Sequence, residues 1–174
     1  MGYTASLSNF QVTENGKALL LSELSHSKTF HARWDYSAFN QTKIFDISYT
    51  LTGAVGGGQN FDEFYWQVIG NGWDKRTEQA EIVVNFPQAI PRNQVYAFAH
   101  GPLGGKFDFV TDNSVKFTVA DIPPKQFVEV RLVFPKNIVA SAASSQKSLQ
   151  HVLDEEKSYL SPAVYKKYLL YSFI

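Results

Sequence analysis

The chain has 174 residues, with 16 Lys and Arg balanced by 16 Asp and Glu, and it contains no cysteine. This length suits one domain, or one domain with an appendage, and is sufficient to bury a substantial core. The missing cysteine excludes disulfides, thiol catalysis and Cys-based metal sites, and the balanced charge gives little support to nucleic-acid binding.

Most of the chain alternates apolar and polar residues with a period of two, which is typical of strands with one buried and one wetter face. The dipeptide Asn15-Gly16 separates two such runs and predicts a tight hairpin turn. Pairs of Gly, Pro, Asp and Asn residues separate the later runs. Strands are expected near residues 5–12, 17–22, 29–36, 43–51, 61–69, 77–86, 94–99, 106–110, 114–120 and 126–134.

Short alternating strands at this spacing predict an all-β, antiparallel β-sandwich of immunoglobulin-like or jelly-roll-like type. The run Gly56-Gly57-Gly58 is interpreted as a flexible loop between two of the strands. We assign the sandwich domain to residues 1–137.

The composition changes after the last strand, where small polar residues suggest a linker. Leu149, Val152, Leu153 and Glu156 then follow at helical spacing and predict an amphipathic helix. Ser161-Pro162 predicts the start of a second helix that continues to Tyr171. Residues 138–174 are therefore expected to form a linker with one or two short C-terminal α-helices.

The aromatic stretch 61–69 is the most informative part of the chain. In an extended strand, Phe64, Trp66 and Val68 share one face, and we interpret this face as core with Trp66 sealed between the sheets. The opposite face consists of Phe61, Glu63, Tyr65, Gln67 and Ile69. This second face is either an aromatic platform for a sugar or peptide, or a sheet face that another element covers.

If the platform interpretation holds, the candidate ligand-binding residues are Tyr65 and Gln67, with Trp73 at the end of the strand. An indole and a phenol offer apolar area together with a hydrogen-bonding group, which suits amphipathic ligands.

Catalytic and metal-binding patterns are weak. Asp62 and Glu63 are adjacent in a strand and therefore point to opposite faces, so a glycosidase pair would need another partner such as Asp74 or Asp108. The four histidines lack metal-ligand spacing, and there is no nucleophile motif. We predict no catalytic residue, no metal site and no cofactor.

Four segments occur in a characteristic order: Phe45-Asp46-Ile47-Ser48-Tyr49-Thr50-Leu51, Asp62-Glu63-Phe64-Tyr65-Trp66, Gly70-Asn71-Gly72-Trp73 and Phe134-Pro135. From about Ala5 to Asn137 the chain thereby resembles a family of bacterial predicted membrane proteins, domain of unknown function 2207. The resemblance implies an extracytoplasmic, β-rich domain anchored by following transmembrane helices, and hence a location at the cell membrane. It implies no catalytic residue.

We therefore expect a non-enzymatic module of the bacterial cell envelope that binds or senses an unknown ligand, such as a glycan, or a protein partner. The full-length protein is expected to be anchored in the membrane, whereas this piece is expected to be soluble, and no nucleic-acid partner is predicted. A cell-envelope glycan hydrolase and a purely structural spacer domain are the alternatives.

Overall fold

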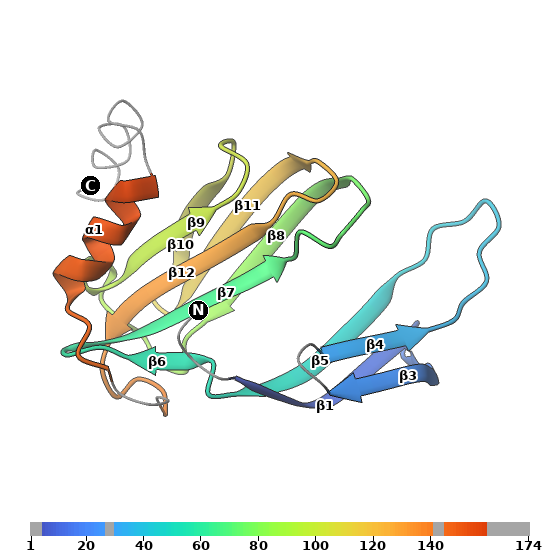
Figure 1. Cartoon of the computed structure of the whole chain (residues 1–174), viewed down its shortest axis with the longest axis horizontal. Coiled ribbons are helices and arrows are strands. Elements are labelled where there is room, and N and C mark those ends of the chain that lie inside the picture. Colours follow the sequence, from blue (N-terminus) through green and yellow to red (C-terminus); the bar gives the residue numbers. More distant parts are fainter. Residues whose placement is uncertain (1–4, 27–29, 141–144, 160–174) are drawn as a thin grey trace. The chain divides into compact units, whose positions relative to one another are not determined.

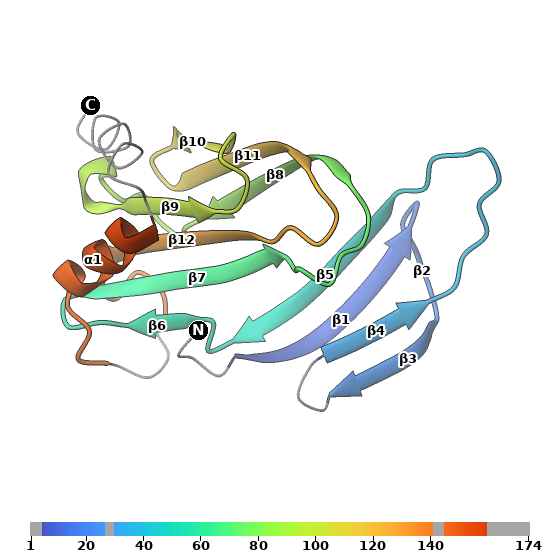
Figure 2. The same cartoon turned by 45° about the horizontal axis from the view of Figure 1, so that its top comes forward.

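The computed structural model describes residues 5–26, 30–140 and 145–159 (Figures 1 and 2). The backbone divides into two compact units, Thr4–Thr52 and the residues from Gly53 onward. We call them the N-terminal unit and the C-terminal unit and describe each by itself. The domain boundary expected after residue 137 stays a prediction.

The N-terminal unit contains a three-stranded antiparallel sheet and a separate hairpin. The sheet has the order β2-β1-β5, with β1 at Ser6–Glu14, β2 at Lys17–Ala18 and β5 at Phe45–Thr52. The hairpin pairs β3, Leu21–His26, with β4, Phe30–Trp34. Asn15 and Gly16 connect β1 to β2 with φ angles of 51° and 75°. The left-handed conformation of both residues suits a two-residue hairpin, so the predicted turn is confirmed.

Aromatic rings hold the N-terminal unit together. The ring centroid of Phe10 lies 5.0 Å from that of Phe30. The ring of Phe45 lies 5.8 Å from Trp34 and 4.9 Å from Tyr36. Among the described side chains of this unit, Val12 is the one buried hydrophobic residue. The hairpin therefore covers the apolar face of the sheet only in part.

The C-terminal unit consists of two antiparallel sheets and a short helix (Figure 1). The four-stranded sheet has the order β6-β7-β12-β9, with β6 at Val55–Gly57, β7 at Phe61–Ile69, β12 at Val128–Pro135 and β9 at Tyr96–His100. The three-stranded sheet has the order β10-β11-β8, with β10 at Lys106–Thr111, β11 at Ser114–Ile122 and β8 at Thr77–Asn85. A 3₁₀ turn, η1, occupies Arg92–Gln94.

Side chains from both sheets meet in one hydrophobic cluster. β11 contributes Val115 and Phe117, and β12 contributes Val130, Leu132 and Phe134, all of them buried. Partly buried residues of β7, β8, β9 and β10 pack around them. Two antiparallel sheets with a shared core form a sandwich, which confirms the predicted all-β, antiparallel sandwich-like fold.

The helix α1, Leu149–Tyr159, confirms the predicted amphipathic helix. It begins after Ser148, whose hydroxyl accepts a hydrogen bond from the N–H of His151 at 3.2 Å and thereby caps the first turn. The side chain of Val152 is fully buried in a cluster with Phe61 and Val133 of the four-stranded sheet. The helix therefore covers the outer face of this sheet. The second predicted helix, to Tyr171, lies outside the described residues.

The expected inside–outside pattern of β7 is wrong at its end. Val128 pairs with Ile69 and Glu129 with Gln67, so Val68 is an extra residue without a partner on β12. Such a β-bulge shifts the alternation by one residue. Ile69 therefore packs inward in the cluster around Val128, whereas Val68 is exposed.

Trp66, next to this bulge, is half-buried rather than sealed between the sheets as predicted. Its ring stacks on the more central Phe64, with centroids 6.5 Å apart.

The glycine run after β5 is not a flexible loop. Gly56 and Gly57 are buried in β6 and pair with Glu63 and Asp62 of β7. A Cβ atom added to Gly58 would overlap the ring of Phe61. Glycine is therefore required at position 58, where the backbone and an aromatic ring approach closely.

Candidate functional site

The outer face of the four-stranded sheet carries a group of polar side chains beneath α1. Along β12, Val130 and Leu132 point into the core, and Glu129, Arg131 and Val133 lie on the opposite face, the one that α1 covers. The register places Arg131 opposite Tyr65 of β7. His100 of β9 lies opposite Glu129. We call the following set the Arg131 cluster: Glu63, Tyr65, His100, Glu129, Arg131, Lys147, Glu155 and Glu156.

Arg131 is the centre of this cluster and is only 1% exposed. Its Nε donates to Oε1 of Glu63 at 2.5 Å, its Nη1 to Oε1 of Glu156 at 2.6 Å, and its Nη2 to Oε2 of Glu155 at 2.7 Å. The guanidinium carbon also lies 5.1 Å from the centroid of the Tyr65 ring. Three carboxylates and one aromatic face thus replace the water that a buried guanidinium loses.

The electrostatics follow from these contacts. Burial alone would lower the pKa of Arg131, but hydrogen bonds to Glu155 and Glu156 and the charge of Glu63 outweigh it and raise that pKa. Burial would likewise raise the pKa of Glu155, but hydrogen bonds from Lys147 and Arg131 and their charges hold that pKa at about 2. The arginine and Glu155 are therefore both ionised at neutral pH.

A second branch of the cluster runs through His100. Its Nε2 lies 2.9 Å from Oε2 of Glu156, and its Nδ1 lies 3.3 Å from the Tyr65 hydroxyl and 3.7 Å from Oε2 of Glu129. The Tyr65 hydroxyl donates to Glu129 at 2.7 Å. Burial, followed by this hydrogen bond, raises the pKa of Tyr65. The ring of Tyr159, at the end of α1, packs against His100 with centroids 4.9 Å apart.

The ion pairs of the cluster connect α1 to the sheet, and its carboxylates are engaged in these contacts. The Nζ of Lys147 lies 2.8 Å from Oε2 of Glu155 and 3.7 Å from Oε2 of Glu63. Each of the four carboxylates in the cluster thus contacts a basic side chain of the described chain. Such an arrangement stabilises a docked helix by charge-assisted hydrogen bonds.

Two of the three predicted ligand-binding residues lie together. The amide of Gln67 donates to Oε1 of Glu129 at 3.5 Å, and Tyr65 bonds the other oxygen of the same carboxylate. Trp73 lies in the loop after β7, where its carbonyl accepts the N–H of Lys125 at 2.7 Å and its side chain is exposed. A ligand site at these three residues stays a prediction.

No sequence pattern predicted a polar cluster of His100, Glu129, Arg131, Lys147, Glu155 and Glu156. One signal was available. Arg131 stands inside the apolar run from Val128 to Phe134, on a strand that other elements cover on both faces. A charged residue in such a strand needs partners, because an isolated buried charge is strongly unfavourable.

The four carboxylates considered for a hydrolase lie on different parts of the C-terminal unit. Asp62 is buried, and its Oδ2 accepts the N–H of Asn137 at 3.2 Å, whereas Glu63 on the opposite face of β7 binds Arg131. Asp74 is exposed in the loop after β7, and Asp108 is exposed on β10 of the other sheet. They do not line a common cleft. Across the described residues, no group of three or more His, Asp or Glu side chains is arranged for a metal ion.

A shallow depression of about 170 Å³ lies where the start of β7, the end of β12 and the start of β9 meet. Its lining is mainly apolar and consists of Asn60, Phe61, Gln94, Tyr96, Val133, Phe134, Pro135 and Leu149. Small-molecule sites usually measure roughly 300–1,000 Å³, so this depression suits a single side chain.

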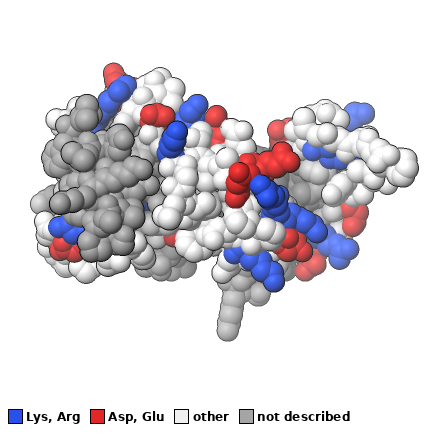
Figure 3. Space-filling model, turned by 90° about the horizontal axis from the view of Figure 1, so that it is seen from above, with Lys and Arg blue, Asp and Glu red and all other residues white. Residues whose placement is uncertain are grey.

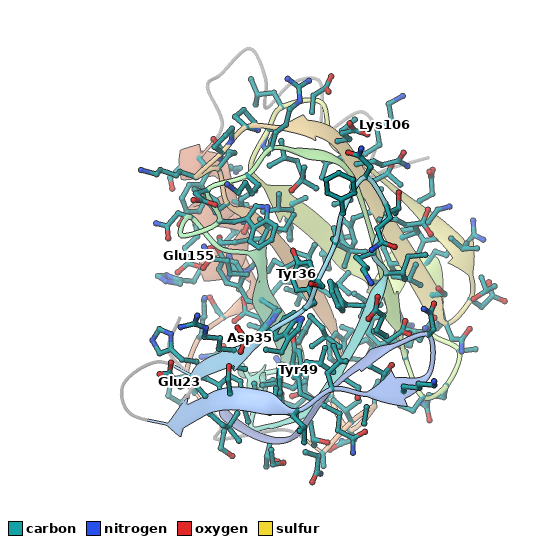
Figure 4. All side chains as sticks on the ribbon, turned by 90° about the vertical axis from the view of Figure 1, so that its right-hand side faces the viewer. Glu23, Asp35, Tyr36, Tyr49, Lys106 and Glu155 are labelled. Carbon is teal, nitrogen blue, oxygen red and sulfur yellow. The ribbon has the colours of Figure 1, made fainter. Side chains whose placement is uncertain are left out.

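The N-terminal unit instead exposes large apolar side chains. Leu20 is 93% exposed, and the loop between β4 and β5 contains Phe39 at 87%, Ile44 at 67% and Tyr36 at 58%. Figure 4 shows Tyr36 on this loop and Tyr49, also exposed, on β5. Acidic and basic side chains are interspersed on the molecular face in Figure 3, with no large field of one sign.

Comparison with known proteins gives one match. A protein-family model described as "Predicted membrane protein (DUF2207) N-terminal domain" matches residues 7–134. The matched region includes strands of both units and ends before α1. Searches of curated proteins and of solved structures give no match. Within the described residues, no helix has the length and apolar character needed to cross a membrane.

Proposed function

The chain belongs to the family of predicted membrane proteins that share the DUF2207 N-terminal domain, and on this premise we propose that it is a non-enzymatic binding module. Its partner is a protein, and the binding surface is the exposed apolar loop between β4 and β5. The module acts on the extracytoplasmic side of the bacterial cell envelope, as the sequence resemblance implied.

The observation that carries this proposal is the exposure of Tyr36, Phe39 and Ile44 within nine consecutive residues. Folding leaves these side chains in water, although burial of apolar surface is favourable by about 25 cal/mol per Å². A partner that covers them gains this free energy. Large exposed apolar side chains that gather on one loop favour an interaction site there.

The geometry of the C-terminal unit supports a role without catalysis. The carboxylates of the Arg131 cluster contact basic side chains and hold α1, so they are engaged in structure. The depression of the C-terminal unit is lined by no carboxylate of the described residues and is too small to hold a sugar ring between two carboxylates. The hydrolase alternative therefore has no candidate acid–base pair among Asp62, Glu63, Asp74 and Asp108.

The spacer alternative requires a surface that no partner needs to cover. Large exposed side chains such as Phe39 and Leu20 are unfavourable in a pure spacer, because they promote aggregation without a function. They therefore favour a binding module over a spacer.

The proposal is tested by site-specific photo-crosslinking in the full-length membrane protein in its host. A photoreactive amino acid replaces Phe39 in one variant and Leu103, an equally exposed residue of the C-terminal unit, in the control. We expect a discrete crosslinked protein from position 39 and none from position 103. Absence of crosslinks at position 39, or the same product from both positions, would contradict the proposal.

The variant Phe39→Ser supplies a second readout. An exposed side chain contributes little to folding, so the free energy of unfolding should change by less than about 0.5 kcal/mol. Loss of the partner in co-purification, with unchanged stability, is the expected result. A large loss of stability would instead assign Phe39 to the fold.

A further inference from the structure

We propose that α1 is a built-in ligand for a carboxylate-binding site centred on Arg131 of the four-stranded sheet, and that an acidic helical segment of a partner protein displaces it. The recognised segment carries two adjacent carboxylates, with an apolar residue three positions before the first of them. This site lies in the C-terminal unit and is independent of the exposed loop that carries the proposed function.

The helix makes few apolar contacts for an element that closes a sheet face. Val152 is its one fully buried hydrophobic residue, and Leu149 is half-buried beside it. Leu153 is partly buried as well, and the helix also contacts the sheet through Glu155, Glu156 and Tyr159. Charged contacts therefore account for a large share of the recognition of α1 by the sheet.

The groups that bind the helix carboxylates stay with the sheet when the helix leaves, and Glu63 and Glu129 stay beside them. Arg131 and His100 belong to β12 and β9. Lys147 precedes the helix, but its carbonyl accepts the N–H of Gln59 at 2.9 Å, and the N–H of Ser145 donates to Gly57 at 2.7 Å. These backbone hydrogen bonds hold residues 145–147 beside β6 and β7. The hinge for release of α1 is therefore Ser148.

The site left behind is a specific acceptor for carboxylates. Glu155 and Glu156 bind the two terminal nitrogens of Arg131, of which Nη2 also contacts Glu63, so release of α1 leaves this guanidinium with Glu63 and the Tyr65 ring. A buried arginine that loses two charged partners is strongly destabilised. The open state is therefore favourable only when other carboxylates take the same positions.

The spacing of the helix defines what such a partner presents. Val152 precedes Glu155 by three residues and Glu156 by four, so all three lie on one helical face. Val152 fills the cluster of Phe61 and Val133 while the two carboxylates reach Arg131. An apolar-x-x-Glu-Glu helix meets the same groups in the same order. Binding of that helix and docking of α1 exclude each other.

The experiment uses the full chain and a labelled peptide with the sequence of residues 148–159. Two chain variants weaken the resident helix, Glu155→Gln/Glu156→Gln and the same pair with Val152→Asp. Hydrogen exchange of the α1 amides reports release of the helix, and intrinsic tryptophan fluorescence reports that the sandwich stays folded. The matched control peptide has Gln at the positions of Glu155 and Glu156.

We expect both variants to release α1 and to bind the native peptide, whereas the wild-type chain binds it weakly. The control peptide should bind the variants about 30-fold less tightly or worse, as expected when a buried charge pair loses one member. Equal binding of the two peptides, no binding to either variant, or α1 amides that stay protected in both would overturn the proposal. Dimerisation of the wild-type chain by exchange of α1 would identify a second copy as the occupant and overturn the assignment to a partner protein.

Discussion

The two units of this protein are built from similar strands but differ in how much they bury. In the C-terminal unit, β12 has a strand on each side, a second sheet over one face and a helix over the other, and Val130 and Leu132 are fully buried. In the N-terminal unit, β5 is an edge strand of its sheet, and Ile47 and Tyr49 are about half exposed. The same alternation of residues thus produces a sealed core in one unit and an open apolar face in the other.

This difference shows that a strand pattern predicts which face of a strand is apolar, not whether another layer covers that face. A sheet buries an apolar face only when another layer packs on it. The hairpin β3–β4 covers part of the N-terminal sheet, through contacts such as Phe10–Phe30. The C-terminal unit, in contrast, recruits both a second sheet and α1. The predictions below test this contrast, starting with the largest effect.

The variant Arg131→Met should break the C-terminal unit most strongly. It leaves Glu63 and Glu156 buried without their main cation, which typically costs about 3–5 kcal/mol of unfolding free energy. Urea denaturation measures the loss. Arg76→Met is the matched control, because Arg76 bonds Asp121 at 2.6 Å on an exposed surface, where the expected cost is below about 1 kcal/mol. Equal effects of the two variants would show that burial does not set the strength of the cluster.

Hydrogen exchange should separate the two units. We expect the amides of β12 to have the highest opening free energy in the chain. The opening free energy of the amides in β1 and β5 should be lower by about 2 kcal/mol, so that these amides exchange about 30-fold faster. The physical reason is the single buried hydrophobic residue, Val12, among the described side chains of the N-terminal unit. Equal protection in β1 and β12 would contradict the contrast.

Acid should weaken the link between α1 and the sheet. The pKa of Glu155 is held at about 2 in the folded state, below its ordinary value of 4.5, so its contribution is present above pH 4.5 and is lost as the pH falls toward 2. The shift corresponds to roughly 3 kcal/mol, but this side chain is about one third exposed, and screening reduces the expected effect to about 1 kcal/mol. Unfolding free energies measured between pH 5 and pH 2.5 check this value. Glu155→Gln should remove this part of the pH dependence, and a variant with an unchanged pH profile would refute the assignment.

The sequence by itself determined the local elements and the family. Alternation located most of the strands, though not β6, Asn15-Gly16 located the first hairpin, and the spacing of Leu149 and Val152 located α1. Each of these signals depends on neighbours within a few residues. The aromatic strand around Trp66 carried the family resemblance, which the match over residues 7–134 confirms. The position of Tyr65 and Gln67 on the same face of β7 also followed from the alternation with a period of two.

Only the tertiary structure decided what covers each face. The bulge that turns Val68 outward requires the partner strand β12, and the close approach at Gly58 requires the ring of Phe61. In the Arg131 cluster one guanidinium binds both Glu63, which lies 68 positions before Arg131 in the chain, and Glu156, which lies 25 positions after it. No local pattern specifies such pairs, because a buried charge selects its partners by proximity in the folded chain rather than by distance along the sequence.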